Sequence, residues 1–259
     1  MLLRRVLNWK MMKVLLMFLT RCRLQFRSGF TLAEVLITLG IIGVVSAITM
    51  PTLVTNCQKM ITKVRVKKTF ATLAQTTYMA EAEDGPVSTW DLDAGQSWEV
   101  ARSFTEDYIA PYLKVAYKCP KNYNAANCNY QMYGLNGKKY SGVNNKTYRF
   151  YLVDGTFVAV WAFNMPSGNH PKRASIFIDI NRPKGENKVG KDIFKLEYLI
   201  VSKTKTSDKI GKIAPAWIDE SRKTLLSNKN EMCHKNQDGT ACLAVIYKDG
   251  WEIASDYPW

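Results

Sequence analysis

The sequence predicts an α+β fold in which one long N-terminal helix crosses a membrane and then packs against an antiparallel β-sheet head. Three observations predict this fold. Residues 30–50 form an apolar run with a single charge, helical periodicity continues to about residue 84, and short strand patterns follow one another after residue 147. Consecutive strands joined by short turns favour an antiparallel sheet, on which a helix can bury one side.

The apolar run from Phe30 to Met50 contains 21 residues. At about 1.5 Å per residue, a helix of this length just spans a hydrocarbon core of about 30 Å. Its one charged residue is Glu34, and an unpaired carboxylate in lipid costs on the order of 2.5 kcal/mol or more. Glu34 therefore needs a proton, access to the interface, or a cation. A cut between Gly29 and Phe30 would create an α-ammonium group that could neutralise the carboxylate of a neighbouring copy.

These residues resemble a known processing site. Gly29, followed by Phe30-Thr-Leu-Ala-Glu34 and a long apolar run, is similar to the cleavage site of type IV pilins and of type II secretion pseudopilins. The resemblance implies that prepilin peptidase cuts after Gly29 and N-methylates Phe30, and that Glu34 guides the docking of subunits. It also implies assembly with identical or related subunits on an inner-membrane platform, with membrane lipid around the helix beforehand.

The resemblance divides the chain into three parts. Residues 1–29 are a basic leader that is removed, residues 30–84 are the long helix with its transmembrane part at 30–50, and residues 85–259 are a periplasmic or extracellular α+β head. The expected location is a single pass of the inner membrane, followed by a pilus or pseudopilus.

The positive charge of the chain belongs largely to the leader. Seven Lys and Arg and no acid precede the cut, so the mature chain keeps +7 of the total net charge of +14. Basic flanks of membrane segments stay in the cytoplasm. Half of the charge is therefore a topology signal, and nucleic-acid binding is not indicated.

The helix is expected to run from Phe30 to about Glu83 and to stop at Asp84-Gly85-Pro86. Pro51 removes a backbone hydrogen bond and should bend it. Gly40 and Gly43 are expected to weaken the turn before Pro51, to form a close-packing face between membrane helices, or to do both.

Beyond Pro51, an apolar stripe recurs at three- and four-residue steps and is expected to lie on the head. The stripe comprises Leu53, Cys57, Met60, Ile61, Val64, Ala71, Ala74 and Tyr78. The upstream residues 30–50 have no such head to cover them, so lipid or identical helices must bury them. This requirement predicts a filament.

Six cysteines include two pairs with the same spacing, Cys119 with Cys128 and Cys233 with Cys242. Neither pair has zinc or redox spacing, so two local disulfides in an oxidising compartment are expected. The second pair also resembles the C-terminal disulfide loop of many pilins. Cys57 remains as an unpaired packing residue on the helix.

Strand patterns begin near residue 147. Residues 148–153 and 156–163 flank Asp154-Gly155, which favours a hairpin with a two-residue turn. Further strands are expected at residues 174–180, 193–202 and 242–247. A short amphipathic helix is expected at residues 98–114.

The stretch between the third and fourth strands carries hard oxygen ligands, which calcium prefers. They are Asp179, Asn181, Asn187 and Asp192, and nearby lysines oppose a cation. A structured turn and a calcium site both remain open. The stretch also looks like a pseudopilin motif, and the resemblance implies that calcium is possible without establishing it.

The sequence contains no recognisable set of catalytic groups, so the chain is not expected to be an enzyme. Its two histidines, His170 and His234, lie in a turn and in a disulfide loop. Trp90, Trp98 and the aromatic tail residues fit packing better than a ligand platform. The alternative to a filament subunit is a monomeric, membrane-anchored extracytoplasmic module that binds calcium or a glycan.

Overall fold

The computed structural model describes residues 29–121, 128–129, 131–165, 172–181, 186–201 and 212–259. Its elements in chain order are α2 (Leu32–Asp84), η1 (Val87–Thr89), α3 (Trp98–Tyr108), η2 (Ala110–Tyr112), β1 (Val115–Lys118), β2 (Met132–Tyr133), β3 (Lys139–Tyr140), β4 (Tyr148–Leu152), β5 (Phe157–Phe163), β6 (Lys172–Asp179), β7 (Ile193–Val201), β8 (Ile213–Pro215), α4 (Arg222–Leu225) and α5 (Cys242–Lys248). The chain divides between Val54 and Thr55 into two compact units, so α2 contributes to both.

α2 is one helix of 53 residues with Pro51 inside it. It ends where the sequence predicts. Gly85 takes the left-handed φ of 80°, and its N–H donates to the carbonyl of Glu81 at 3.1 Å. A glycine in this conformation is a common helix end, and Pro86 prevents continuation. The bend expected at Pro51 stays a prediction.

In the first unit, no other described residue covers the side chains of α2. Leu36, Ile42 and Ile48 are 60%, 60% and 71% exposed. Among the described residues, α2 is the one helix long and apolar enough to cross a membrane. The predicted membrane segment is therefore a helix that the chain itself leaves uncovered.

The second half of α2 turns a different face to the head from the one predicted. Most of the predicted stripe points away, with Met60 and Tyr78 62% and 72% exposed. A threonine can replace an apolar residue here because its hydroxyl bonds to the helix backbone while its methyl group packs. Thr77 Oγ1 donates to the carbonyl of Leu73 at 2.8 Å and lies 2.6 Å from the hydroxyl of Tyr198 in β7. The buried residues are Thr62, Val66, Thr69, Leu73, Thr76, Thr77 and Ala80.

The main sheet has six antiparallel strands in the order β1-β4-β5-β6-β7-β8. The predicted hairpin is β4–β5, but its predicted two-residue turn is wrong. Gly155 N–H donates to the carbonyl of Leu152, and Leu152 N–H donates to that of Thr156, both at 2.9 Å. The loop therefore contains the three residues 153–155, with Gly155 in the left-handed conformation at φ 87°. This loop geometry also matches the twist of the strands.

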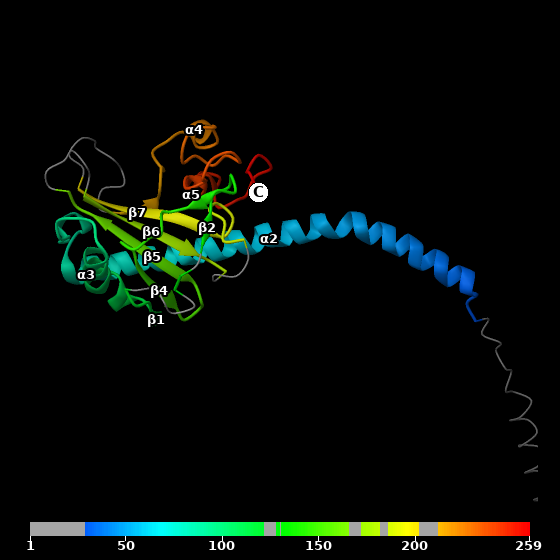
Figure 1. The fold of residues 1–259 in the computed structure, drawn as a ribbon, viewed down its shortest axis with the longest axis horizontal. Helices are drawn as coiled ribbons and strands as arrows, with labels where there is room; N and C mark the ends of the chain where they lie inside the picture. Colours follow the sequence, from blue (N-terminus) through cyan, green and yellow to red (C-terminus); the bar gives the residue numbers. More distant parts are fainter. Residues whose placement is uncertain (1–28, 122–127, 130, 166–171, 182–185, 202–211) are drawn as a thin grey trace, which may run out of the picture. The chain divides into compact units, whose positions relative to one another are not determined.

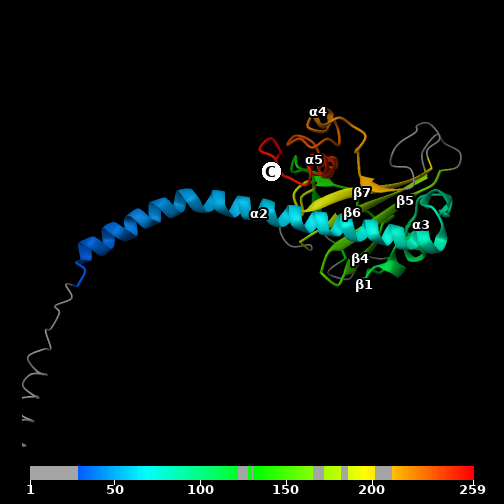
Figure 2. The same ribbon diagram turned by 180° about the vertical axis from the view of Figure 1, so that it is seen from behind.

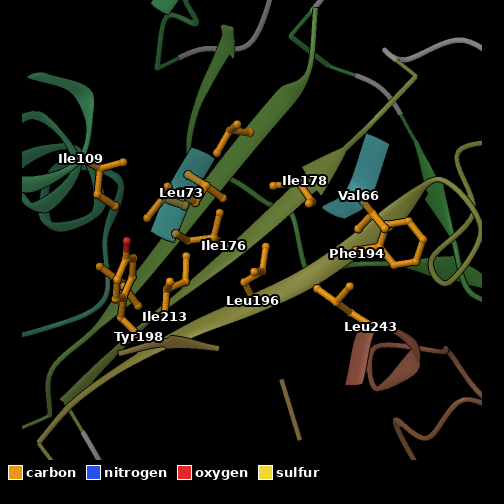
Figure 3. Close-up of a cluster of buried hydrophobic side chains, with 14 of the residues drawn as sticks. Val66, Leu73, Ile109, Ile176, Ile178, Phe194, Leu196, Tyr198, Ile213 and Leu243 are labelled. Atoms are coloured by element: carbon orange, nitrogen blue, oxygen red, sulfur yellow. The ribbon is translucent and has the colours of Figure 1, made fainter. Parts of the chain in front are cut away.

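The part of α2 in the second unit, residues 55–84, lies along one face of this sheet, behind it in Figure 1 and in front of it in Figure 2. The core between them contains Val66 and Leu73 from α2, Ile176 from β6 and Leu196 from β7, all fully buried (Figure 3). Leu243 of α5 extends the same cluster. Alternate residues of β6 and β7 point toward α2 because side chains alternate along a strand.

The opposite face of the sheet carries a second, smaller cluster. Phe157, Phe177 and Ile193 pack there with the disulfide between Cys119 and Cys128, whose Cα atoms lie 5.7 Å apart. β2 and β3 form a separate two-stranded ribbon. The disulfide that the cysteine spacing predicts thus closes the outer side of the head.

The strand expected at residues 242–247 is wrong, because this segment is the helix α5. Residues Cys242–Ile246 are all buried, and a short continuous apolar run suits a buried helix as well as a buried strand. Gly250 at φ 70° and the bond from Trp251 N–H to the carbonyl of Ile246 form the end of this helix. The second predicted disulfide, Cys233–Cys242, ties the start of α5 to the preceding loop.

Leu73→Ala should destabilise the head by about 2–5 kcal/mol, because it removes a fully buried side chain between α2 and the sheet. Val64→Ala is the matched control on the outward face of the same helix, and its expected effect is about 0.5 kcal/mol or less. Urea unfolding of the detergent-solubilised chain, followed by tryptophan fluorescence, measures both. Equal losses at the two positions would contradict this orientation of α2.

Candidate processing and assembly site

The junction between Gly29 and Phe30 lies just before the first turn of α2. Both residues are exposed, Phe30 by 87%, and neither belongs to a helix or strand. Gly29 does not have a left-handed φ, and a Cβ atom added to it would meet no atom within 4 Å. The described fold therefore gives no packing or backbone reason for glycine at this position.

Glu34 has a local partner that sequence reasoning missed. Its Oε2 accepts hydrogen bonds from the N–H and the hydroxyl of Thr31, both at 2.8 Å, and Thr31 Oγ1 accepts from Glu34 N–H at 3.2 Å. This is a reciprocal capping box, and its signal was the Thr-x-x-Glu spacing before an apolar run. Oε1 has no hydrogen bond within the described chain, so one carboxylate oxygen remains for another molecule.

Gly40 and Gly43 lie inside α2 without a structural need for glycine. Neither has a left-handed φ, and a Cβ on either would meet nothing within 4 Å. Glycine inside a helix costs roughly 1 kcal/mol relative to alanine. Open space around both glycines is compatible with a weakened turn and with close approach by another helix, and both roles stay predictions.

The part of α2 in the second unit also has an apolar outward face. There Met60, Ile61 and Val64 are 62%, 49% and 58% exposed. Cys57 lies among them as an exposed free thiol, so its expected role as a packing residue is wrong within the single chain. The surface that would have to be covered in an assembly therefore extends beyond the predicted membrane segment.

The predicted calcium ligands lie at the connection between β6 and β7, of which residues 182–185 are outside the described part. Asp179 Oδ1 accepts from Asn181 N–H at 3.0 Å, and the Asn181 amide donates to Asp192 Oδ2 at 3.3 Å. Asp192 Oδ1 accepts from Lys188 N–H at 2.6 Å. Burial raises the pKa of the Asp192 carboxyl. The structure thus brings three of the four ligands into one hydrogen-bonded network.

The fourth residue, Asn187, has a left-handed φ of 46° and a buried Oδ1 without a hydrogen bond in the described chain. Lys188 and Lys191 form ion pairs with Glu186 at 2.9 and 3.5 Å. The carboxylate of Glu186 offsets part of the electrostatic repulsion that the two lysines would exert on a bound cation. However, the described residues contain no group of three or more His, Cys, Asp or Glu placed to hold a metal. The network already closes the turn, as the structured-turn alternative expects, and calcium stays a prediction.

Two families match the chain. Residues 25–50 match the prokaryotic N-terminal methylation motif, and residues 52–259 match a family of unknown function, DUF6613. The chain belongs to the DUF6613 family. It matches no curated protein and no solved structure.

The methylation motif confirms the resemblance to type IV pilin-like proteins. In this DUF6613 protein, it implies processing by prepilin peptidase, anchoring in a membrane and subsequent assembly with pilin subunits into a pilus or pseudopilus. It indicates a structural protein. The matched region covers the Gly29–Phe30 junction and the first unit of α2 as far as Met50, so the motif and the exposed apolar helix coincide.

Aromatic residues in the DUF6613 region pack as expected. Trp90 is 1% exposed and stacks on Tyr108 with ring centroids 4.7 Å apart. Near the C-terminus, Tyr257 is buried and donates to the carbonyl of Gly190, while the Trp259 ring lies 5.9 Å from Lys59 Nζ. These contacts dock the tail on the head rather than present it as a ligand platform.

His234 is the histidine that the structure describes, and its described contact is structural. His234 Nδ1 accepts from the backbone N–H of Asn236 at 3.2 Å, and Cys233 beside it is bonded to Cys242. His170 lies outside the described residues.

The calcium hypothesis predicts a higher Tm in millimolar calcium than in EDTA, because an ion that binds only the folded chain stabilises it. Asp192→Asn should remove the difference. Since burial raises the pKa of Asp192, its protonated form favours folding below the unfolded pKa, and this contribution is lost as pH rises through the folded pKa. The calcium effect should therefore grow with pH. Equal Tm values in calcium and EDTA at neutral pH would leave only the structured turn.

Proposed function

We propose that this chain is a structural subunit of a type IV pilus or of a type II secretion pseudopilus. The observation that carries the proposal is the apolar outward surface of α2, which no other part of the described chain covers and which begins at a methylation motif. A helix with such a surface is stable in water only after another apolar surface covers it.

Processing removes residues 1–29, and the mature chain begins at N-methylated Phe30. The helix at residues 30–84 then carries the head at residues 85–259. The exposed, non-helical junction gives a peptidase access to the Gly29 carbonyl, and the absence of a packing role leaves Gly29 free to serve peptidase recognition.

Before assembly, lipid surrounds residues 30–50, and the head lies outside the cytoplasm. The two disulfides support an oxidising location for the head. Assembly on an inner-membrane platform would move the helix from lipid into a bundle of like helices. Gly40 and Gly43 give these helices a flat contact surface.

Glu34 guides this transfer through its charge. The new α-ammonium group of one subunit neutralises Glu34 of a neighbour, which removes the cost of a carboxylate in an apolar bundle. Oε2 keeps its bonds to Thr31, and Oε1 accepts from the incoming ammonium group. The capping box thus orients the carboxylate that docking uses.

Intact mass and N-terminal sequencing of chain recovered from membranes test the processing step. We expect a chain that starts at N-methylated Phe30 and contains two disulfides. Gly29→Asp should leave the leader attached, because a charged side chain cannot enter a subsite built for glycine. An uncut wild-type chain would turn residues 28–51 into an ordinary anchor and favour a monomeric binding module.

Variants at Glu34 separate its charge from its hydrogen bonds. Glu34→Leu and Glu34→Gln should both insert in the membrane and yet enter sheared filaments at least tenfold less than wild type. Glutamine keeps the capping acceptor, whereas Thr31→Val removes the cap and keeps the charge. If Glu34→Gln entered filaments normally and Thr31→Val did not, Glu34 would act in assembly only through its capping hydrogen bonds and not through its charge.

A further inference from the structure

Two exposed cations, Lys67 and Lys68, interrupt the apolar outward face of α2. Lys67 is exposed and lies one step along the helix from Val64 and from Ala71, at the three- and four-residue spacing of the stripe. If another helix covers this face, the ammonium group is removed from water. A charge in that position is costly unless an opposite charge meets it.

Lys67 differs from the other cations of this half of α2, each of which has a contact within the chain. Lys63 pairs with Glu252 at 2.7 Å and Lys68 with Asp154 at 2.9 Å. Arg65 reaches the carbonyl of Ile180, and Lys59 lies over Trp259. Lys67 has no hydrogen bond or ion pair within the residues that the structure describes.

The same helix carries carboxylates at its far end. Glu83 and Asp84 are exposed, and neither has an ion pair within the described chain. Both accept from the Tyr112 hydroxyl, at 2.8 and 3.4 Å. The bond to Glu83 raises the pKa of Tyr112 to about 12, so the tyrosine remains a donor and Glu83 keeps acceptor capacity for a cation.

We propose that Lys67 of one copy pairs with Glu83 of a neighbouring copy and thereby fixes the axial offset between their α2 helices. The proposal rests on the function proposed above and names the contact that sets its geometry. The two residues are 16 positions apart, so the offset is about 24 Å.

Packing without an offset is disfavoured by the charges on α2. Residues 55–80 contain five cations and no acid, so parallel helices in register would place Lys67 beside Lys67.

The pairing joins two different sides of one helix. Sixteen residues correspond to a rotation of about 160° around the axis, so Lys67 and Glu83 point in different directions. A contact between two different patches of identical subunits is heterologous, and it repeats from copy to copy without closing a dimer. The arrangement therefore suits a filament.

A charge swap tests the pairing in the full-length chain. We expect Lys67→Glu and Glu83→Lys each to lower recovery in sheared filaments at least tenfold, and the double variant to restore it to within about threefold of wild type. These four chains form a double-mutant cycle, which separates the interaction between residues 67 and 83 from the effect of changing each charge alone. No improvement in the double variant, or normal recovery of both single variants, would overturn the proposal.

Matched controls exclude simpler causes. Lys229→Glu makes the same charge change on an exposed lysine outside α2. Tyr112→Phe removes the hydroxyl bonds to Glu83 and Asp84 and leaves both carboxylates in place. Both variants should assemble normally. Membrane levels and resistance of the head to protease check folding. Failure of wild type to enter filaments would reject the proposed function, whereas normal wild type, a defective Glu34→Leu and normal Lys67→Glu would reject only this contact.

Discussion

The structure depends on the apolar surface that α2 presents to its surroundings. In the first unit this surface is exposed on all sides, and in the second it continues along the side that faces away from the sheet. At about 25 cal/mol per Å², covering some twenty large apolar side chains contributes tens of kcal/mol. No surface ion pair approaches that scale. The apolar surface of α2 therefore has to be covered by lipid before assembly and by other helices afterwards.

The two faces of the second half of α2 explain both a success and a failure of prediction. The sequence predicted the helix, its length and its end correctly, because 3.6-residue periodicity and Asp84-Gly85-Pro86 are strong local signals. It placed the apolar stripe on the wrong side. Threonines such as Thr69 and Thr76 pack against the head after bonding their hydroxyls within the helix, and an apolar pattern cannot represent that option.

Local signals also separate what was predictable in the head from what was not. The disulfide pairs and the strands β4 to β7 followed from spacing and alternation. α5 did not, because burial on every side removes the periodicity that distinguishes a helix from a strand. The short strands β1 and β8 pair at the edges of the sheet through tertiary contacts. At the candidate site, the Thr-x-x-Glu spacing contained the signal for the Thr31–Glu34 capping box, but the apolar run that follows makes Glu34 resemble an unpaired charge in lipid.

Cys57 offers the most direct test of whether other copies cover the outward face of α2. It is the free cysteine of the described chain and lies on the face in question. The measurement is the rate of labelling by a water-soluble maleimide in sheared filaments and in detergent-dispersed subunits. A cysteine introduced at Lys229 in a Cys57→Ser chain serves as a reference that stays exposed in both. The account predicts labelling of Cys57 at least tenfold slower in filaments, and equal rates in the two states would contradict it.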